Sequence, residues 1–407
     1  MSFFDFLRSN VRWLSAGVLL TLASGFGQTF FISVFAGEIR QEFGLSHGAW
    51  GGIYSLGTTA SAIMMIWAGA LTDKFRVRSL GAIVMIGLAL ACLSMAMAPA
   101  AWALPFVVFL LRFTGQGMNS HIASVAMARW YVATRGRALA IASLGYAIGE
   151  AALPLIFVSL MSLFYWRFLW VLCGLLALLC IPAILALLKE ERTPQSVADD
   201  SPSTGMLGLH WQRFGVLRHW LFWAVIPSLM APSAFITALF FHQVHLAEVK
   251  GLSHAALVAL FPVYTIVGVL STLVFGWLID RFGTARLMPI YQLPLAAGFV
   301  LFSYAESYFA AGLAMAVMAI TVGGQATLAV AFWAEFYGTK HLGAIKAMAM
   351  AALVFGSAIG PGVTGYLIDQ GLKFEDQMAG IAIFTIAASG LVAIAVGRAR
   401  QMLTVAP

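Results

Sequence analysis

The segment that decides the fold is residues 69–75, GALTDKF, which recurs 207 positions later as residues 276–282, GWLIDRF. Both copies begin with glycine and carry aspartate four residues on, followed by a cation and a phenylalanine. GLSH at 44–47 recurs at the same offset, and GQ at 115–116 and AIG at 147–149 recur at nearly the same one. Order and spacing preserved over half a chain indicate an internal duplication. We therefore expect two related halves.

Composition places both halves in a membrane. Of the 407 residues, 61% are hydrophobic and 10% charged, and the mean hydropathy is +0.92. A soluble domain carries roughly 25% charged residues, so too little polar surface remains here for an ordinary soluble enzyme. An outer-membrane β-barrel is also excluded, because its strands alternate apolar and polar residues over about 10 positions. The apolar runs here are instead long enough to cross a bilayer as helices.

Twelve such apolar segments follow one another along the chain. They cover residues 12–36, 49–72, 79–98, 102–127, 138–162, 166–188, 219–246, 255–279, 286–304, 308–333, 342–367 and 378–397. We predict an all-α polytopic membrane protein of 12 transmembrane helices in two six-helix repeats. The repeats are an N-terminal bundle (1–189) and a C-terminal bundle (218–407), joined by a cytoplasmic linker (190–217). Within the linker, LHWQRF at 209–214 mixes aromatics with cations and predicts a helix on the membrane surface.

Lysine and arginine predict the orientation, since they are enriched in cytoplasmic loops. With both termini in the cytoplasm, 17 of the 23 Lys and Arg lie on the cytoplasmic side and four lie outside. The other two, Arg112 and Lys346, fall within predicted helices. We therefore predict a multi-pass protein of the cell inner membrane with cytoplasmic N- and C-termini. This distribution also accounts for the net charge of +7 without a nucleic-acid partner.

The repeated loop resembles the signature loop of the major facilitator superfamily. A glycine at a helix end lets a neighbouring helix approach, and an aspartate there can accept hydrogen bonds from N–H groups at a facing helix end. The resemblance implies a transporter whose cytoplasmic side is held closed by these loops. One departure is RVR at 76–78, where the family has a glycine followed by two cations. The predicted gating residues are Gly69, Asp73, Arg78, Gly276, Asp280 and Arg281.

A narrower resemblance rests on RFTGQG at 112–117 and GYAIGE at 145–150. These segments are most similar to the monocarboxylate-porter and oxalate–formate-antiporter branch, which implies a monocarboxylate-like anion as substrate. Relatives in that branch place substrate-binding cations in helices 8 or 11. Helix 8 here, 255–279, has no charged residue. Lys346 lies in the first turns of helix 11, where its side chain can extend to the cytoplasmic surface.

Arg112 is the only cation predicted near the membrane centre, where an unpaired charge is costly and commonly functional. On an α-helix, Arg112, Gln116 and Asn119 share one face, and Tyr146 and Glu150 share a face of the next helix. Similar depths in the bilayer predict an Arg112–Glu150 ion pair. Either Arg112 binds an anionic substrate while Glu150 takes up a proton, or the pair is a permanent structural bridge.

Four further polar residues are weaker candidates for substrate binding or coupling. Gln28, Tyr264 and Gln325 lie within predicted helices, where each can line a cavity or form an interhelical hydrogen bond. His242 lies at the outer end of helix 7 beside His245. A histidine there can couple protons near neutral pH or simply cap the helix.

Together these features predict a secondary active transporter that moves a small organic anion by alternating access, coupled to protons. The alternative is an exporter of amphipathic drugs or metabolites. The sequence lacks the GxxxxGK[ST] loop of ATP-driven pumps and any metal or nucleophile constellation, so we expect no enzyme activity, no metal and no cofactor. The expected partners are the substrate, a proton and membrane lipid, with the protein acting as a monomer.

Overall fold

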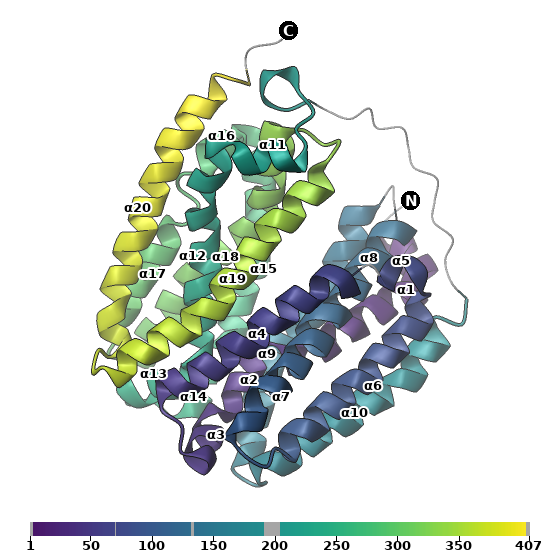
Figure 1. The fold of residues 1–407 in the computed structure, drawn as a ribbon, viewed down its shortest axis with the longest axis vertical. Helices are drawn as coiled ribbons and strands as arrows, with labels where there is room; N and C mark the ends of the chain where they lie inside the picture. Colours follow the sequence, from purple (N-terminus) through teal and green to yellow (C-terminus); the bar gives the residue numbers. More distant parts are fainter. Residues whose placement is uncertain (1–2, 70, 132–133, 191–203, 404–407) are drawn as a thin grey trace. The chain divides into compact units, whose positions relative to one another are not determined.

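The computed structural model describes residues 3–69, 71–131, 134–190 and 204–403. All regular elements in these ranges are helices, in agreement with the all-α prediction (Figure 1). The chain forms two compact units. The first comprises residues 1–200 and 240–244, and the second comprises residues 201–239 and 245–407.

The first unit contains six spans in the described ranges. The first span consists of α1 (Phe3–Ala23), η1 (Ser24–Gly27), α2 (Thr29–Ile32), η2 (Ser33–Phe35) and α3 (Ala36–Phe43). The second is α4 (His47–Ala68), and the third is α6 (Val77–Ala96), preceded by the short α5 (Leu71–Lys74). The fourth consists of η3 (Ala101–Ala103), α7 (Leu104–Leu111), η4 (Arg112–Asn119) and α8 (Ser120–Trp130), and the last two are α9 (Arg135–Met161) and α10 (Trp166–Leu187).

The second unit begins with η5 (Met206–Gly208) and α11 (Arg213–Arg218) and then forms the remaining spans. The seventh span is α12 (Trp220–Phe241) with α13 (Gln243–Val249), the eighth is α14 (His254–Val258) with α15 (Phe261–Phe282), and the ninth is α16 (Thr284–Leu287) with α17 (Leu293–Ser303). The last three are α18 (Tyr308–Tyr337), α19 (Leu342–Asp369) and α20 (Phe374–Arg400).

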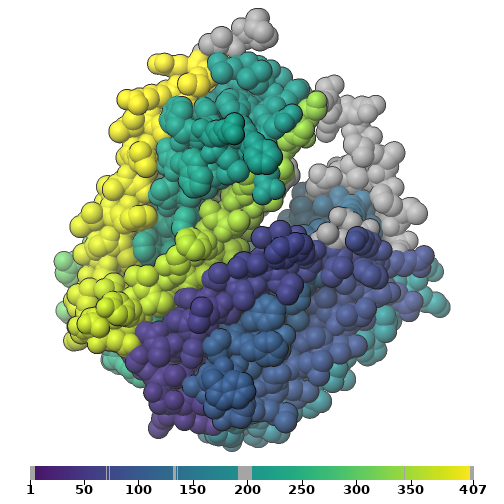
Figure 2. All heavy atoms as spheres, in the orientation of Figure 1, coloured from purple at the N-terminus to yellow at the C-terminus, as the bar shows by residue number. Residues whose placement is uncertain are grey.

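The two units repeat their helix pairing, as the sequence duplication predicts. In the first unit α4 packs on the fourth span and α6 packs on α10. The corresponding pairs of the second unit are α15 with α18 and α17 with α20. Side chains fill the spaces between the ribbons of the first unit on the face drawn in Figure 2.

The predicted number of helices is confirmed, but several helices are interrupted. Nine helices in the described ranges are long and apolar enough to cross a membrane, and the bent first span makes a tenth. The remaining two are α4, which is rich in glycine, serine and threonine, and the ninth span. The ninth span is broken because α16 ends at Leu287 and α17 begins only at Leu293.

The break in the first span bends the helix axis by 48°. At Gln28 the backbone is extended (φ −86°, ψ 154°), so the α-helical hydrogen bonding is interrupted there. Gly27, just before the break, lies directly against the fourth span. A Cβ atom added to Gly27 would lie 2.1 Å from the carbonyl oxygen of Leu111. Only glycine fits at so close a contact.

The fourth span changes its hydrogen bonding where it meets this break. Residues Arg112–Asn119 form a π-helix between α7 and α8. π-Helical segments are rare in proteins, and those that occur are often found at functional sites. Within it, a Cβ atom added to Gly115 would lie 2.6 Å from the Cα atom of Gly27. The two irregular segments therefore meet through their backbones.

The predicted surface helix of the linker starts later than expected. Residues 209–212 are not helical, and α11 begins at Arg213. The aromatic ring of Trp211 does not lie on a free surface, because it packs edge-on against Tyr337 at the end of α18, with ring centroids 5.4 Å apart. Val216 of α11 is fully buried in the same hydrophobic core. Only part of the segment is buried in this core, because Leu209 and Phe214 are 53% and 74% exposed.

Candidate functional site

Arg112 is the first residue of the π-helix, and its side chain is buried, with only 1% exposed. Its Nη1 donates hydrogen bonds to the carbonyl oxygen of Gly27 (3.1 Å) and to the hydroxyl oxygen of Thr29 (3.4 Å). A carbonyl at a helix end lacks the N–H that would bind it in a continuous helix. The break in the first span therefore supplies an acceptor for the guanidinium.

Aromatic and hydroxyl groups complete the surroundings of Arg112. The guanidinium carbon lies 5.3 Å from the ring centre of Tyr54 on α4, a distance at which a cation is attracted to an aromatic face. The hydroxyl oxygens of Tyr54 and Thr29 are 2.5 Å apart. Phe241, in the segment 240–244 of the first unit, contacts the Tyr54 ring at 4.7 Å and stacks on Trp50 at 5.7 Å. Arg112 is thus surrounded by neutral groups.

The predicted ion pair between Arg112 and Glu150 is not formed within the described ranges. There, Arg112 contacts a carbonyl, a hydroxyl and an aromatic ring, and its Nε has no hydrogen-bond partner. Glu150, buried on α9, accepts a hydrogen bond from the Tyr146 hydroxyl (3.1 Å). Depth in the bilayer, the basis of the prediction, specifies a position along each helix but not the direction of each side chain.

The predicted polar stripe on the fourth span is also altered. It assumes the α-helical repeat, whereas a π-helix closes its hydrogen bonds five residues back and rotates less per residue. Asn119 is fully buried, and its Nδ2 lies 3.9 Å from the Sδ atom of Met85 on α6. Gln116 is half-buried. Arg112 and Asn119 therefore contact different neighbours, and the stripe does not form one surface.

Gln28 and His242 both lie in the first unit. Gln28, at the break itself, is buried with 7% exposed. His242, between α12 and α13, is also buried, and its ring centre lies 5.9 Å from that of His47. The next residue, Gln243, donates a hydrogen bond to the Ser33 hydroxyl (2.7 Å). Residues 240–244 thus pack on the part of the first span that follows the break.

Tyr264 and Gln325 belong to the second unit. Tyr264 is buried on α15, with 2% exposed. Gln325 on α18 donates a hydrogen bond from Nε2 to the carbonyl oxygen of Leu229 on α12 (2.7 Å). This contact corresponds to the interhelical hydrogen bond that was one of the two alternatives for Gln325.

The first signature loop, residues 69–75, is contacted by α8, the last part of the fourth span. In the predicted orientation this part lies nearest the cytoplasm. The carbonyl oxygen of Gly69 lies 3.2 Å from Nε2 of His121, and Arg129 donates to the carbonyl oxygen of Thr72 (2.6 Å). Both donors lie on α8. The sequence pattern identified the loop but missed these two residues.

The other two predicted gating residues of this loop differ in their surroundings. Arg78, at the start of α6, donates from Nε to the carbonyl oxygen of Leu185 near the end of α10 (3.1 Å). Its contact is therefore within the first unit. The side chain of Asp73 lies outside the part of the chain that the structure describes.

The second signature loop is held differently. A Cβ atom added to Gly276 would meet nothing within 4 Å, Asp280 is exposed, and Arg281 contacts aromatic rings of its own helix. The anchoring contact comes from Glu335 on α18, which accepts hydrogen bonds from the backbone N–H (3.2 Å) and hydroxyl (2.5 Å) of Thr284. A carboxylate is favourable at the start of a helix, here α16.

Comparison with known proteins identifies the family. A model of the Major Facilitator Superfamily matches residues 17–274 and 241–401. The chain belongs to this superfamily. The superfamily consists of transporters, so the chain is a multi-pass membrane transporter of a small molecule.

Solved superfamily structures share this fold over nearly the whole chain. One is a bacterial homolog of the human lysosomal transporter Spinster, in an inward-facing and occupied conformation, with 18% identity, a TM-score of 0.72 and coverage of 98% of this chain and 99% of that chain. Another is the nucleoside transporter NupG, with 14% identity, a TM-score of 0.70 and coverage of 96% and 99%. No curated protein matches the sequence. The narrower resemblance to the monocarboxylate branch stays a prediction.

Several residues around Arg112 were not predicted from the sequence, because a single residue of these types is common in any helix. Tyr54 lies within α4 and Thr29 directly after the break of the first span, and both contact Arg112. Tyr54 and Trp50 are spaced four residues apart on one face of α4, a pattern also typical of helix packing. In chemical terms, the arrangement offers a fixed cation, two hydroxyls and aromatic faces.

Proposed function

We propose that this transporter carries a small organic anion and that Arg112 binds its negative charge. A buried guanidinium is costly unless its charge is compensated. Within the described ranges Arg112 contacts only neutral groups, and its Nε has no hydrogen-bond partner. A carboxylate would supply both the counter-charge and the acceptor for Nε, because its two oxygens match the donors of a guanidinium. This unsatisfied cation is the observation that carries the proposal.

We further propose that Glu150 couples transport to protons. Glu150 is a buried carboxylate on the span next to Arg112, and it accepts a hydrogen bond from the Tyr146 hydroxyl. A buried carboxyl group beside a hydroxyl can take part in proton transfer. We propose that the protein lies in the inner membrane with both termini in the cytoplasm. In that orientation the proton gradient across the membrane would drive accumulation of the anion in the cell.

The anion proposal is tested first by binding. The purified protein is heated with acetate, lactate, oxalate and benzoate, because a ligand that binds the folded state raises the unfolding temperature. Benzamide, the neutral counterpart of benzoate, serves as the matched ligand control. We expect at least one carboxylate to stabilise the protein and benzamide to have no effect.

The role of Arg112 is tested with the best carboxylate. Arg112→Lys keeps the charge but loses the two-pronged geometry, so affinity should fall by about tenfold or more, equivalent to about 1.4 kcal/mol. Arg76→Lys, at an exposed position, is the matched control and should bind like the original protein. If folded Arg112→Gln still binds the carboxylate with unchanged affinity, Arg112 does not determine the sign of the substrate.

A second candidate function is export of amphipathic drugs or metabolites. It is favoured by the aromatic rings near Arg112, which include Tyr54, Trp50 and Phe241. Uptake of labelled benzoate into proteoliposomes would support the anion carrier. Uptake of an uncharged aromatic dye with no response to carboxylates would support the exporter.

A further inference from the structure

A groove of about 400 Å³ lies at the end of the first unit where the first span finishes. It is formed by α3, the end of α9 and the start of α10. Its walls are Glu38, Gln41, Glu42, Met161, Phe164, Tyr165 and Trp166. All of these residues belong to the first unit, and none takes part in the Arg112 site.

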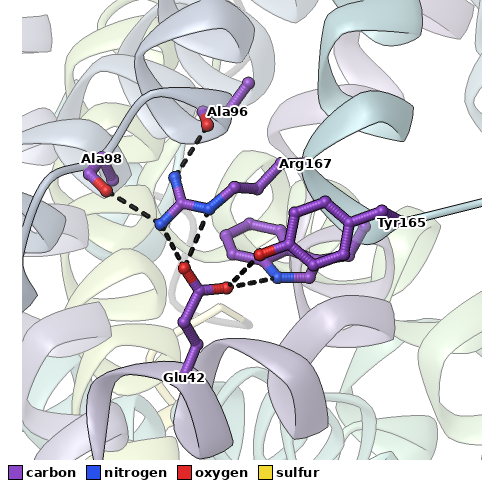
Figure 3. A network of polar contacts seen from close by, with 6 residues as sticks. Glu42, Ala96, Ala98, Tyr165 and Arg167 are labelled. Carbon is purple, nitrogen blue, oxygen red and sulfur yellow. Dashed lines mark hydrogen bonds and ion pairs between the residues drawn. The ribbon is translucent and has the colours of Figure 1, made fainter.

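One of the two acidic residues, Glu42, is already neutralised (Figure 3). Arg167 donates to its Oε1 from Nε (3.0 Å) and Nη2 (2.6 Å). The Tyr165 hydroxyl and the Trp166 Nε1 donate to its Oε2 (2.7 and 2.8 Å). Arg167 also donates to the backbone carbonyls of Ala96, the last residue of α6, and of Ala98. This network holds the wall of the groove in place. Because Arg167 compensates the negative charge of Glu42, that charge is not free to bind a ligand.

The other acidic residue, Glu38, is not neutralised in this way. It lies one turn earlier on α3 and lines the same groove. Its Oε2 is buried and has no hydrogen-bond partner in the described part of the chain. A buried carboxylate oxygen without a partner is unfavourable. The groove therefore carries one negative charge that a bound cation would compensate.

The remaining wall is aromatic. Phe164 and Tyr165 are 46% and 60% exposed, and Met161 adds a thioether beside them. Aromatic faces attract ammonium groups, and such faces with a carboxylate are a typical binding site for alkylammonium ligands. The wall already binds one cation, because the Arg167 guanidinium carbon lies 4.7 Å from the centre of the Trp166 ring.

We propose that this groove binds an alkylammonium group, with Glu38 as its counter-charge and Phe164 and Tyr165 as its aromatic wall. The ammonium can belong to a lipid headgroup or to a free organic cation. Tyrosine and tryptophan are typical of the depth at which lipid headgroups lie. The charge required here is opposite to that of the proposed substrate, so the groove and the Arg112 site are independent.

The charge requirement is tested with choline and 3,3-dimethyl-1-butanol, its neutral counterpart of the same shape. The full-length protein is placed in nanodiscs of phosphatidylglycerol, and tryptophan fluorescence is followed during titration. Choline should bind about tenfold or more tightly than the alcohol, because only the cation is attracted to the aromatic faces and to the Glu38 carboxylate. Glu38→Gln should lose this preference.

Matched variants separate a binding site from a general charge effect. Glu306→Gln removes an exposed carboxylate from a loop of the second unit and should leave choline binding unchanged. Phe164→Leu keeps the charge of Glu38 but removes an aromatic face, so affinity should fall several-fold. If the alcohol binds as tightly as choline, or if both Glu38→Gln and Phe164→Leu bind choline normally, the proposal is wrong.

The source of the ammonium is tested with nanodiscs that also contain phosphatidylethanolamine. Native mass spectrometry then counts the phosphatidylethanolamine molecules retained by the original protein and by Glu38→Gln. Retention that is lost in Glu38→Gln and displaced by choline identifies a lipid headgroup. Choline binding without retained phosphatidylethanolamine identifies a free cation, and the absence of both would overturn the proposal.

Discussion

The position of Arg112 at the break of the first span determines what it can bind. The guanidinium is held on one side by the carbonyl of Gly27 and on another by the ring of Tyr54. These contacts orient the group without neutralising it. The residue is therefore fixed in place by neutral groups, and under the proposed function its charge is left for the substrate.

Glu150 gives a prediction at the same scale. Glu150→Gln removes the proposed proton-binding group but keeps the hydrogen-bonding shape, so pH-gradient-driven accumulation in proteoliposomes should be lost. Counterflow exchange of the same anion needs no net proton movement and should persist. Gradient-driven uptake that is unchanged in Glu150→Gln would remove this residue from the coupling mechanism.

His219, between α11 and α12, predicts a pH dependence of stability. Its Nδ1 lies 3.0 Å from the hydroxyl oxygen of Tyr337, and burial lowers its pKa below the ordinary value of 6.5. The unfolded chain then binds the proton more readily than the folded protein. The stabilising contribution is complete above about pH 6.5 and is lost as the pH falls towards the lowered pKa.

The measurement is the unfolding temperature between pH 7.5 and pH 5. The original protein should lose several degrees more over this interval than His219→Gln, which cannot titrate. His341→Gln, a partly exposed histidine of the same unit, is the matched control. Equal losses in His219→Gln and the original protein would contradict the prediction.

At this scale the sequence predicted which residue is unusual but not what it contacts. A lone arginine in an apolar segment is conspicuous, and Arg112 is indeed buried. Its neighbours come from the first and second spans, and no local pattern specifies which side chains point towards it. The same limit explains why Glu335 and Arg129, which anchor the two signature loops, were not identified.

The helices themselves were predictable, whereas their irregularities were not. Long apolar segments identify spans because hydropathy averages over about 20 residues. The π-helix and the break at Gln28 each involve only a few residues. They depend on the contact between Gly27 and Gly115, which joins segments far apart in the sequence.

This contact gives a prediction for the two elements. Gly115→Ala would place a methyl group 2.6 Å from the Cα atom of Gly27, so the segments must separate. We expect destabilisation of about 1–3 kcal/mol, as for overpacked cores, with loss of carboxylate binding. Gly380→Ala on α20, which meets nothing within 4 Å, should unfold at an unchanged or slightly higher temperature in the same denaturation experiment. A Gly115→Ala protein as stable as Gly380→Ala would show that the contact is dispensable.

Across the whole molecule, both units join the corresponding span ends by an ion pair, with the charges in opposite order. In the first unit Glu42 ends the first span and Arg167 begins the sixth. In the second unit Lys250 ends the seventh span and pairs with Glu375 at the start of the twelfth (2.5 Å). Lys250 also donates to the carbonyl oxygen of Ser303 at the end of α17 (2.8 Å). At the 207-residue offset Glu42 corresponds to Val249 and Lys250 to Phe43. The two ion pairs therefore do not use equivalent positions, and the repeat pattern could not reveal them.

The Lys250–Glu375 pair predicts the effect of reversing charge. Lys250 is largely buried, with 7% of its side chain exposed, so Lys250→Glu should destabilise the protein by about 3 kcal/mol or more. Adding Glu375→Lys should recover most of the loss. Arg12→Glu breaks an exposed ion pair with Glu190 and should change the unfolding temperature little. A double variant no more stable than Lys250→Glu would show that the pair itself contributes little.

The 48° bend in the first span has a mechanical consequence. A continuous α-helix is a stiff rod, and torque applied at one end turns the other. Here the helix is interrupted at Gln28. Before the break α1 packs on α9, and after it α3 is joined to α10 by the Glu42–Arg167 ion pair. Rotation of one segment can therefore be absorbed at Gln28, next to the Gly27 carbonyl that binds Arg112 of the fourth span.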